Sequence, residues 1–96
     1  MPGKPPFRII GVALREPDGT LWALEAPKRH HDVIQLMSQS KKTPIEIALS
    51  EQGFIAWNGF SEPQFQTREE AAATAIYTGQ IKTLKWPPDL YSEDLW

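Results

Sequence analysis

The residues with the clearest chemical potential form a charged run at the start of a predicted helix, Lys28-Arg29-His30-His31-Asp32. A helix N-terminus carries about half a positive charge and unpaired amides, so Ser, Thr or Asp usually occupies it. Here the expected N-cap positions, Ala26 and Pro27, have no side-chain acceptor, and only Asp32 suits the helix dipole. A cationic helix start with free N–H donors is well suited to a phosphate or a carboxylate. We therefore predict an anion site at this point.

A second polar segment, Ser92-Glu93-Asp94, lies close to the end of the sequence. It could fold back and neutralise Arg29 and the histidines, since structural ion-pair networks gather charges in this way. Alternatively, the helix start takes an external anion. The two interpretations are compatible, because the two segments would then form the donor wall and the acceptor wall of one pocket. Both segments are therefore predicted to bind the ligand.

The adjacent histidines, His30 and His31, favour binding over metal chemistry or catalysis. They lie about 100° apart around a helix, so one shared metal ion would need further ligands such as Asp32, Glu93 and Asp94. His30 falls on the apolar stripe and is expected in the core, whereas His31 is expected to face solvent. Sequence patterns such as GxSxG, the P-loop, GxGxxG and HExxH are absent. We predict no catalytic residue, cofactor or metal site; an acid–base enzyme using His31 with Glu93 or Asp94 remains a third hypothesis.

Length and composition limit what can position such a site. The chain has 96 residues, of which 41% are hydrophobic and 23% charged, values typical of one globular domain. We expect residues 7–96 to form that domain and residues 1–6 to be a mobile N-terminal arm. The absence of cysteine excludes disulfides and thiolate metal sites and fits a reducing cytoplasm. A net charge of −2 argues against duplex nucleic acid as a partner, and no apolar run is long enough to predict membrane insertion.

Period-two patterns predict an antiparallel sheet of four or five strands. The clearest strand is residues 7–15, with Ile10, Val12 and Leu14 on one face, followed by hairpin residues 16–19 and a return at residues 20–25. Asn58-Gly59 predicts a second, two-residue turn. The further strand predictions are residues 53–57, 60–66 and 81–86, while residues 45–49 are either a strand or an extended loop. Glu62-Pro63 interrupts the return at 60–66 and suggests a bulge or an edge position.

Two helices should pack on this sheet to give an α+β domain. The first is predicted at about residues 28–39 from the stripe His30, Val33, Ile34 and Met37. The second begins with a Thr67–Glu70 capping box, ends at Gly79, and is expected to bury the face formed by residues 72, 75, 76 and 79. Residues 90–96 should add a short turn or helix.

Two further groups of residues have simple structural interpretations. The four tryptophans, Trp22, Trp57, Trp86 and Trp96, are expected to build the core, with an acceptor for each indole N–H. One exposed tryptophan would instead favour stacking on a base. The pair Lys41-Lys42 is interpreted as a solvated helix end, where cations suit the dipole.

Three passages, taken in order, resemble a group of small proteins of tailed bacteriophages and prophages. They are residues 29–34 (RHHDVI), residues 51–55 (EQGFI), and residues 68–96, which run from REEA through Gly79-Gln80 to LYSEDLW. The resemblance covers residues 9–96. It departs at residues 59–66, where the group has a tight G-R-F-V return and this chain has a longer segment without that arginine, so any role of the arginine is not carried over.

The resemblance implies a small accessory protein that acts in the cytoplasm of a bacterial host. Genes of this kind commonly counter host defence, which implies two classes of partner: an anionic, nucleotide-like signal that the protein sequesters, or a host defence protein such as a CRISPR effector. We expect a non-enzymatic binding protein of the first class, with the protein–protein inhibitor as the alternative. A small core also makes a homo-oligomer an expectation.

Overall fold

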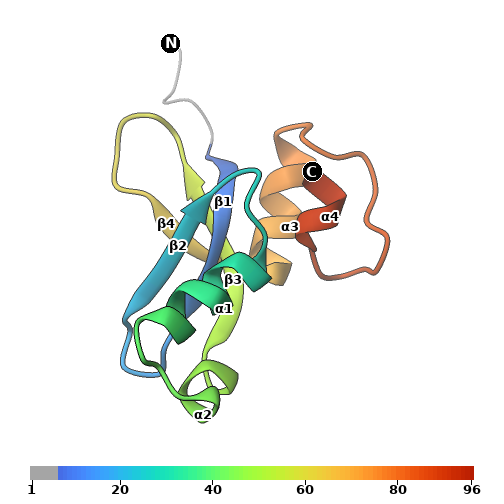
Figure 1. Cartoon of the computed structure of the whole chain (residues 1–96). Helices are drawn as coiled ribbons and strands as arrows, with labels where there is room; N and C mark the ends of the chain where they lie inside the picture. The colour runs from blue at the N-terminus through green and yellow to red at the C-terminus, as the bar shows by residue number, and fades with distance from the viewer. Residues whose placement is uncertain (1–6) are drawn as a thin grey trace.

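The computed structural model describes residues 7–96, and the predicted arm at residues 1–6 lies outside the described part of the chain. A four-stranded antiparallel sheet of order β2-β1-β3-β4 carries the two longer helices on one face (Figure 1), which confirms the predicted α+β class. The elements in chain order are β1 (Arg8–Arg15), β2 (Leu21–Glu25), α1 (His30–Gln39), α2 (Pro44–Ala48), β3 (Glu51–Trp57), β4 (Gln64–Thr67), α3 (Arg68–Tyr77) and α4 (Ser92–Leu95).

The first hairpin forms where the sequence predicts it. Gly19 has a φ of +95°, and the Asp18 side chain accepts a hydrogen bond from the backbone N–H of Thr20 at 2.9 Å. The predicted alternation in β1 is wrong at one point, because the register shifts between Ile9 and Gly11. This bulge places Ile9 in the core beside Val12 and Leu14, where the simple alternation would put Ile10.

One hydrophobic core fills the space between the sheet and the helices. Phe54 from β3, Leu14 from β1 and Met37 from α1 are its largest fully buried side chains. Helix α3 approaches the sheet closely because it presents alanines, of which residues 71, 72 and 75 are buried. The predicted buried face of α3 is wrong at Ile76, which is 47% exposed, and at Gly79, which is also exposed, because the helix turns residue 71 inward instead.

The buried carboxylate of Glu16 ties the first hairpin to the chain that follows α1. Glu16 is 7% exposed. Its carboxylate accepts hydrogen bonds from the Trp22 indole N–H at 2.8 Å and from the Lys42 ammonium at 3.1 Å. The interpretation of Lys41-Lys42 as a solvated helix end is therefore wrong for Lys42, because a buried carboxylate needs a paired cation.

Residues 44–48 form a short helix, α2, where the sequence pattern left a choice between strand and loop. The Thr43 hydroxyl accepts from the Glu46 backbone N–H, the Glu46 carboxylate accepts from the Thr43 N–H, and Pro44 occupies the first turn. This local capping box outweighs the apolar alternation, which is why Ile45 and Leu49 point into solvent at 72% and 66% exposure.

The connection between β3 and β4 is longer than the predicted two-residue turn. Asn58 uses its side-chain oxygen to accept from the backbone N–H groups of Phe60 and Ser61, both at 2.9 Å, and so organises a wider loop. The edge strand β4 then begins at Gln64, directly after Pro63, which has no N–H to donate to a neighbouring strand.

The chain after α3 does not form the predicted fifth strand. The Thr67–Glu70 capping box is present, and Gly79 follows the helix with a φ of +77°. The side-chain amide of Gln80 then bonds the backbone N–H and C=O of Ile9 at 2.7 and 2.9 Å. The Gln80 amide thus makes the hydrogen bonds to Ile9 that a neighbouring strand would make. Residues 81–86 form irregular chain before α4.

Gly11 offers a direct test of the sheet. A Cβ atom there would lie 2.4 Å from the backbone oxygen of Leu24, so β1 and β2 would have to separate. We expect Gly11→Ala to lower the free energy of unfolding by about 1–3 kcal/mol in urea denaturation. The exposed Gln35→Ala change on α1 serves as control and should stay within about 0.5 kcal/mol of wild type. Equal stability of Gly11→Ala and wild type would contradict the close pairing of β1 with β2 at this residue.

Candidate functional site

The charged run predicted as an anion site lies at the start of α1, but the helix begins later than expected. His30 is the first helical residue, and Arg29, with extended φ and ψ, is the N-cap. The predicted N-cap positions, Ala26 and Pro27, are therefore wrong, and Lys28 precedes the helix. As at the predicted positions, the N-cap side chain offers no acceptor, because the Arg29 guanidinium accepts no hydrogen bond from the backbone N–H groups of the helix. The Asp32 carboxylate instead accepts from the Arg29 backbone N–H at 2.8 Å.

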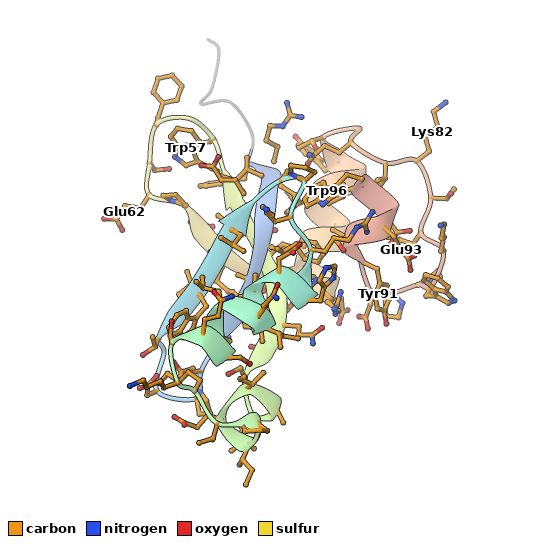
Figure 2. The ribbon with its side chains drawn as sticks, viewed as in Figure 1. Trp57, Glu62, Lys82, Tyr91, Glu93 and Trp96 are labelled. Carbon is orange, nitrogen blue, oxygen red and sulfur yellow. The ribbon has the colours of Figure 1, made fainter. Side chains whose placement is uncertain are left out.

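The C-terminal segment docks against this helix start, as one of the two interpretations predicted. One guanidinium nitrogen of Arg29 donates to the Ser92 hydroxyl at 3.3 Å, and the other donates to the main-chain oxygen of Trp96. In return, the Trp96 indole N–H donates to the Lys28 carbonyl at 3.0 Å. Figure 2 shows Trp96 on the inner side of α4, beside the chain that leads into α1. Residues 28–29 and 92–96 therefore form one contact.

The acidic side chains of that segment do not supply the acceptors, which corrects the neutralisation hypothesis. Asp94 caps α4 by accepting from the Tyr91 N–H at 2.9 Å, and Glu93 is exposed on the outer side of the segment (Figure 2). Within residues 7–96 the ion pairs are Arg15–Glu51, His31–Asp32, Lys42–Glu16 and Lys42–Glu46. The half-buried guanidinium of Arg29 is thus held by the Ser92 hydroxyl and the main-chain oxygen of Trp96, and by no Asp or Glu side chain among residues 7–96.

His30 is a structural residue and leaves the candidate binding set. It is 8% exposed, its Nε2 atom lies 2.7 Å from the Gly53 carbonyl oxygen, and its ring meets Phe54 edge-on at 5.0 Å. Burial lowers the pKa of His30 to about 4, against the opposing effect of the Gly53 contact. The expectation of a core histidine is therefore confirmed, and at neutral pH its ring carries no charge.

His31 faces solvent, as expected, and stands beside Asp32. Its side chain is 74% exposed, and Nε2 lies 3.5 Å from an Asp32 carboxylate oxygen. The hydrogen bond from the Arg29 N–H, assisted by the nearby charges of His31 and Lys28, lowers the pKa of Asp32. No group of three or more His, Asp or Glu side chains among residues 7–96 is arranged to hold a metal ion. Lys28 and His31 are exposed here, and Arg29 between them and the C-terminal segment is half-buried.

Sequence reasoning missed a second arginine, Arg68, that holds the other end of the same segment. It donates to the Leu90 carbonyl at 2.8 Å and to the Gln52 side chain, and its guanidinium lies 4.4 Å from the centre of the Tyr91 ring. Desolvation by burial lowers the pKa of Arg68. The available signal was its position, because Arg68 is a cation in the first turn of a capped helix, the same anomaly that marked Arg29.

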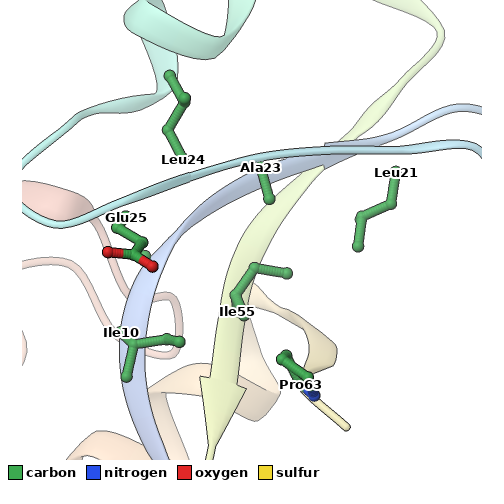
Figure 3. A pocket seen from close by; sticks show the side chains of 8 residues that line it. Ile10, Leu21, Ala23, Leu24, Glu25, Ile55 and Pro63 are labelled. Atoms are coloured by element: carbon green, nitrogen blue, oxygen red, sulfur yellow. The ribbon is translucent and has the colours of Figure 1, made fainter.

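The main apolar groove lies elsewhere, on the sheet face that carries neither α1 nor α3. It has a volume of about 290 Å³ and is seen in Figure 3, where side chains from three strands and Pro63 surround it. The lining residues are Ile10, Gly11, Leu21, Ala23, Leu24, Glu25, Ile55 and Pro63. None of them belongs to the candidate set at the start of α1, so the molecule offers two separate surfaces for binding.

Comparison with known proteins identifies a family. The model of a family described as phage T4 y16D protein matches residues 8–96. No curated protein and no solved structure matches the chain. Among residues 7–96, no helix has the length and apolar character needed to cross a membrane.

The buried His30 predicts a loss of stability as the pH falls. Its folded-state pKa of about 4 lies below the ordinary value of 6.5, so the unfolded chain binds more protons between these two values. Stability is therefore full above pH 6.5 and declines toward pH 4, by an amount on the order of 3 kcal/mol. Urea unfolding at pH 7, 6 and 5 measures this decline. His31→Ala should show the same decline, and a free energy of unfolding that stays constant from pH 7 to 5 would contradict the assignment.

Proposed function

Because residues 8–96 match its model, this chain belongs to the phage T4 y16D protein family, and we propose that it is a non-enzymatic binding protein for an anionic ligand. The ligand class that we propose is a signalling nucleotide, and the role is counter-defence by sequestration in the host cytoplasm. The site is the start of α1, where Lys28, Arg29 and His31 face the ligand and Ser92 borders it.

The observation that carries this proposal is that no Asp or Glu side chain among residues 7–96 pairs with Arg29. A half-buried cation loses hydration and normally gains a carboxylate partner in return. The contacts of Arg29 are with the Ser92 hydroxyl and the main-chain oxygen of Trp96, while Lys28 adds a cationic group and the α1 dipole adds positive potential. An incoming phosphate would satisfy this positive field and could take two parallel hydrogen bonds from a guanidinium.

The proposed role fits the size of the protein. Sequestration needs only a stoichiometric site, which a small domain can supply. The acid–base hypothesis remains a prediction. In the structure, His31 stands beside Asp32, while Asp94 is engaged in capping α4 and Glu93 faces outward.

Arg29→Gln should weaken the binding of pyrophosphate and nucleotides at least tenfold, because it removes the half-buried charge from the site. Isothermal titration measures the affinity, and a thermal shift gives a second readout, since a ligand at 100 times its Kd adds about 2.7 kcal/mol of stability. The exposed pair Lys28→Gln and His31→Gln should weaken binding without loosening the C-terminal segment.

The matched control is Arg15→Gln. Arg15 is an exposed arginine on β1 that already pairs with Glu51 at 2.7 Å, so its loss should leave anion affinity unchanged. Equal weakening by Arg15→Gln and Arg29→Gln would indicate a general charge effect. Absence of binding by pyrophosphate and by all nucleotides tested would refute the proposed function.

A second candidate function, inhibition of a host defence protein, is supported by the uncovered sheet face. Leu21 is 44% exposed beside the apolar groove, and Phe60, on the loop that leads to Pro63, is 77% exposed. Exposed aromatic and aliphatic side chains next to a groove are typical of protein-binding surfaces. The acidic residue Glu25 lies on the same strand as Leu21, and Glu62 lies on the same loop as Phe60.

Copurification from host lysate separates the two functions. If the protein is an inhibitor, wild type and Arg29→Gln should both recover one stoichiometric protein partner, and Leu21→Glu should lose it because a charge enters the apolar surface. Native mass spectrometry measures the stoichiometry. Recovery of a small anionic molecule in place of a protein would contradict the inhibitor function and support the first proposal.

A further inference from the structure

Two of the four tryptophans lie outside the core. Trp86 is 53% exposed and Trp57 is 38% exposed, so the expectation that every tryptophan would build the core is wrong for these two. The backbone N–H of Asp89 bonds the Trp86 carbonyl, and the Asp94 carboxylate accepts from the N–H of the residue before Trp86. Two acidic residues beside this ring do not favour the stacking of an anionic nucleotide. A more exposed apolar surface lies on α2.

Helix α2 presents two aliphatic side chains to solvent, Ile45 at 72% and Leu49 at 66% exposure. They lie one turn apart, so their Cβ atoms are about 6 Å from each other on one side of the helix. The helix is fixed in this orientation, because Ile47 packs against the core and the Thr43–Glu46 capping box holds its start. We call Ile45 and Leu49 the α2 pair.

The α2 pair and the apolar groove of the sheet face are separate surfaces of one molecule. Figure 1 shows α2 beyond one end of the sheet, and both members of the pair are open to solvent. The groove is open as well, since Leu21 on its wall is 44% exposed (Figure 3). One copy of the chain therefore carries an apolar projection and an apolar hollow that do not fill each other.

The spacing of side chains in the groove matches the spacing of the α2 pair. Leu21, Ala23 and Glu25 are alternate residues of β2 that all line the groove, with about 7 Å between successive members. Leu49 can therefore lie against Leu21 while Ile45 lies against Ala23. The groove volume of about 290 Å³ has room for these two branched, four-carbon side chains.

The charges at the two surfaces are complementary. Glu25 is the one charged residue among those that line the groove, and Lys41 precedes α2 in the chain. Both are exposed, and neither forms an ion pair within residues 7–96. The neighbouring Lys42, by contrast, is already paired with Glu16 and Glu46. When the α2 pair lies in the groove in the order given above, Lys41 comes to the end at Glu25.

We propose that the groove on the sheet face receives the α2 pair of a second copy of this chain. The contact is heterologous, because the projection and the groove are different surfaces of the molecule, so the copies associate head to tail. The inference is independent of the anion site. It gives the sheet face an occupant other than the host protein of the second candidate function, and the two occupants exclude each other.

Sedimentation equilibrium of the full chain measures this association. The average mass of wild type should rise above the 10.9 kDa of one chain as the concentration increases. Ile45→Glu and Leu21→Glu each place an unpaired charge in the apolar contact, so each should weaken the association about tenfold or more. The matched control is Ile76→Glu, the same change at an aliphatic residue on α3 with 47% exposure, which should leave the association unchanged.

A mixture of the two weakened variants tests the head-to-tail arrangement. Ile45→Glu retains an intact groove and Leu21→Glu retains an intact α2 pair, so an equimolar mixture should form a dimer with one chain of each kind and nothing larger. Native mass spectrometry with one variant labelled with nitrogen-15 identifies this dimer. Circular dichroism reports whether each variant is folded, and Pro63→Glu, at another residue of the groove, replaces Leu21→Glu if that variant unfolds.

Reversal of the charge pair tests the orientation of the contact. Lys41→Glu and Glu25→Lys should each weaken the association about 2- to 5-fold, the effect expected for one exposed ion pair. The double variant should recover the affinity of wild type, because the pair is restored with its signs exchanged.

Three results overturn the inference: a wild type that stays monomeric at every concentration, an Ile45→Glu variant that associates as wild type does, or a mixture that forms no dimer. Equal weakening by Ile76→Glu and Ile45→Glu also overturns it, since the effect would then not belong to α2. If wild type is monomeric and Leu21→Glu loses a host protein in copurification, the sheet face serves the second candidate function instead.

Discussion

The guanidinium of Arg29 joins two parts of the chain that are more than sixty residues apart, and the candidate site depends on this contact. Arg29 is the N-cap residue of α1, and its side chain reaches Ser92 and Trp96, while the Trp96 indole donates a hydrogen bond to the Lys28 carbonyl. Arg68 performs the matching task at Leu90 and Tyr91. Two arginines, each at a helix start, therefore hold the C-terminal segment against the domain, and neither pairs with an Asp or Glu side chain among residues 7–96.

Holding a segment with arginines that have no Asp or Glu partner among residues 7–96 leaves their charge uncancelled by any side chain. An Asp or Glu partner would have made a stronger clamp but would have cancelled the charge. Nearby, Glu93 is exposed and Asp94 caps α4, so neither carboxylate pairs with the two arginines. The net charge of −2 therefore does not describe the local charge around Arg29 and Arg68. In a member of a phage protein family, this charge distribution is compatible with the anionic ligand that we propose.

Local signals predicted the parts of the fold that depend on neighbours in sequence. The Thr67–Glu70 box and the hairpin at Asp18-Gly19 are set within four residues, and both are present. The same kind of signal at Thr43–Glu46 determines α2, where the prediction used only the apolar alternation of residues 45–49. The bulge after Ile9 could not be predicted, because it depends on how β1 meets both of its neighbouring strands. For the site, opposite charge predicted that residues 28–32 and 92–94 would lie together. The acceptors for Arg29 could not be predicted, because they depend on the directions in which the Glu93 and Asp94 side chains point.

Gln80 gives the sheet a feature with a consequence for assembly. Its side-chain amide copies the donor and acceptor spacing of a peptide group and pairs with Ile9 where β2 has already ended. A foreign strand that approached β1 at this point would find both backbone groups occupied. Pairing with another chain is thereby directed to the outer edges of β2 and β4, the first of which has five residues and the second four. A single amide side chain thus limits the length of sheet on which an intruding strand, native or aggregated, could grow.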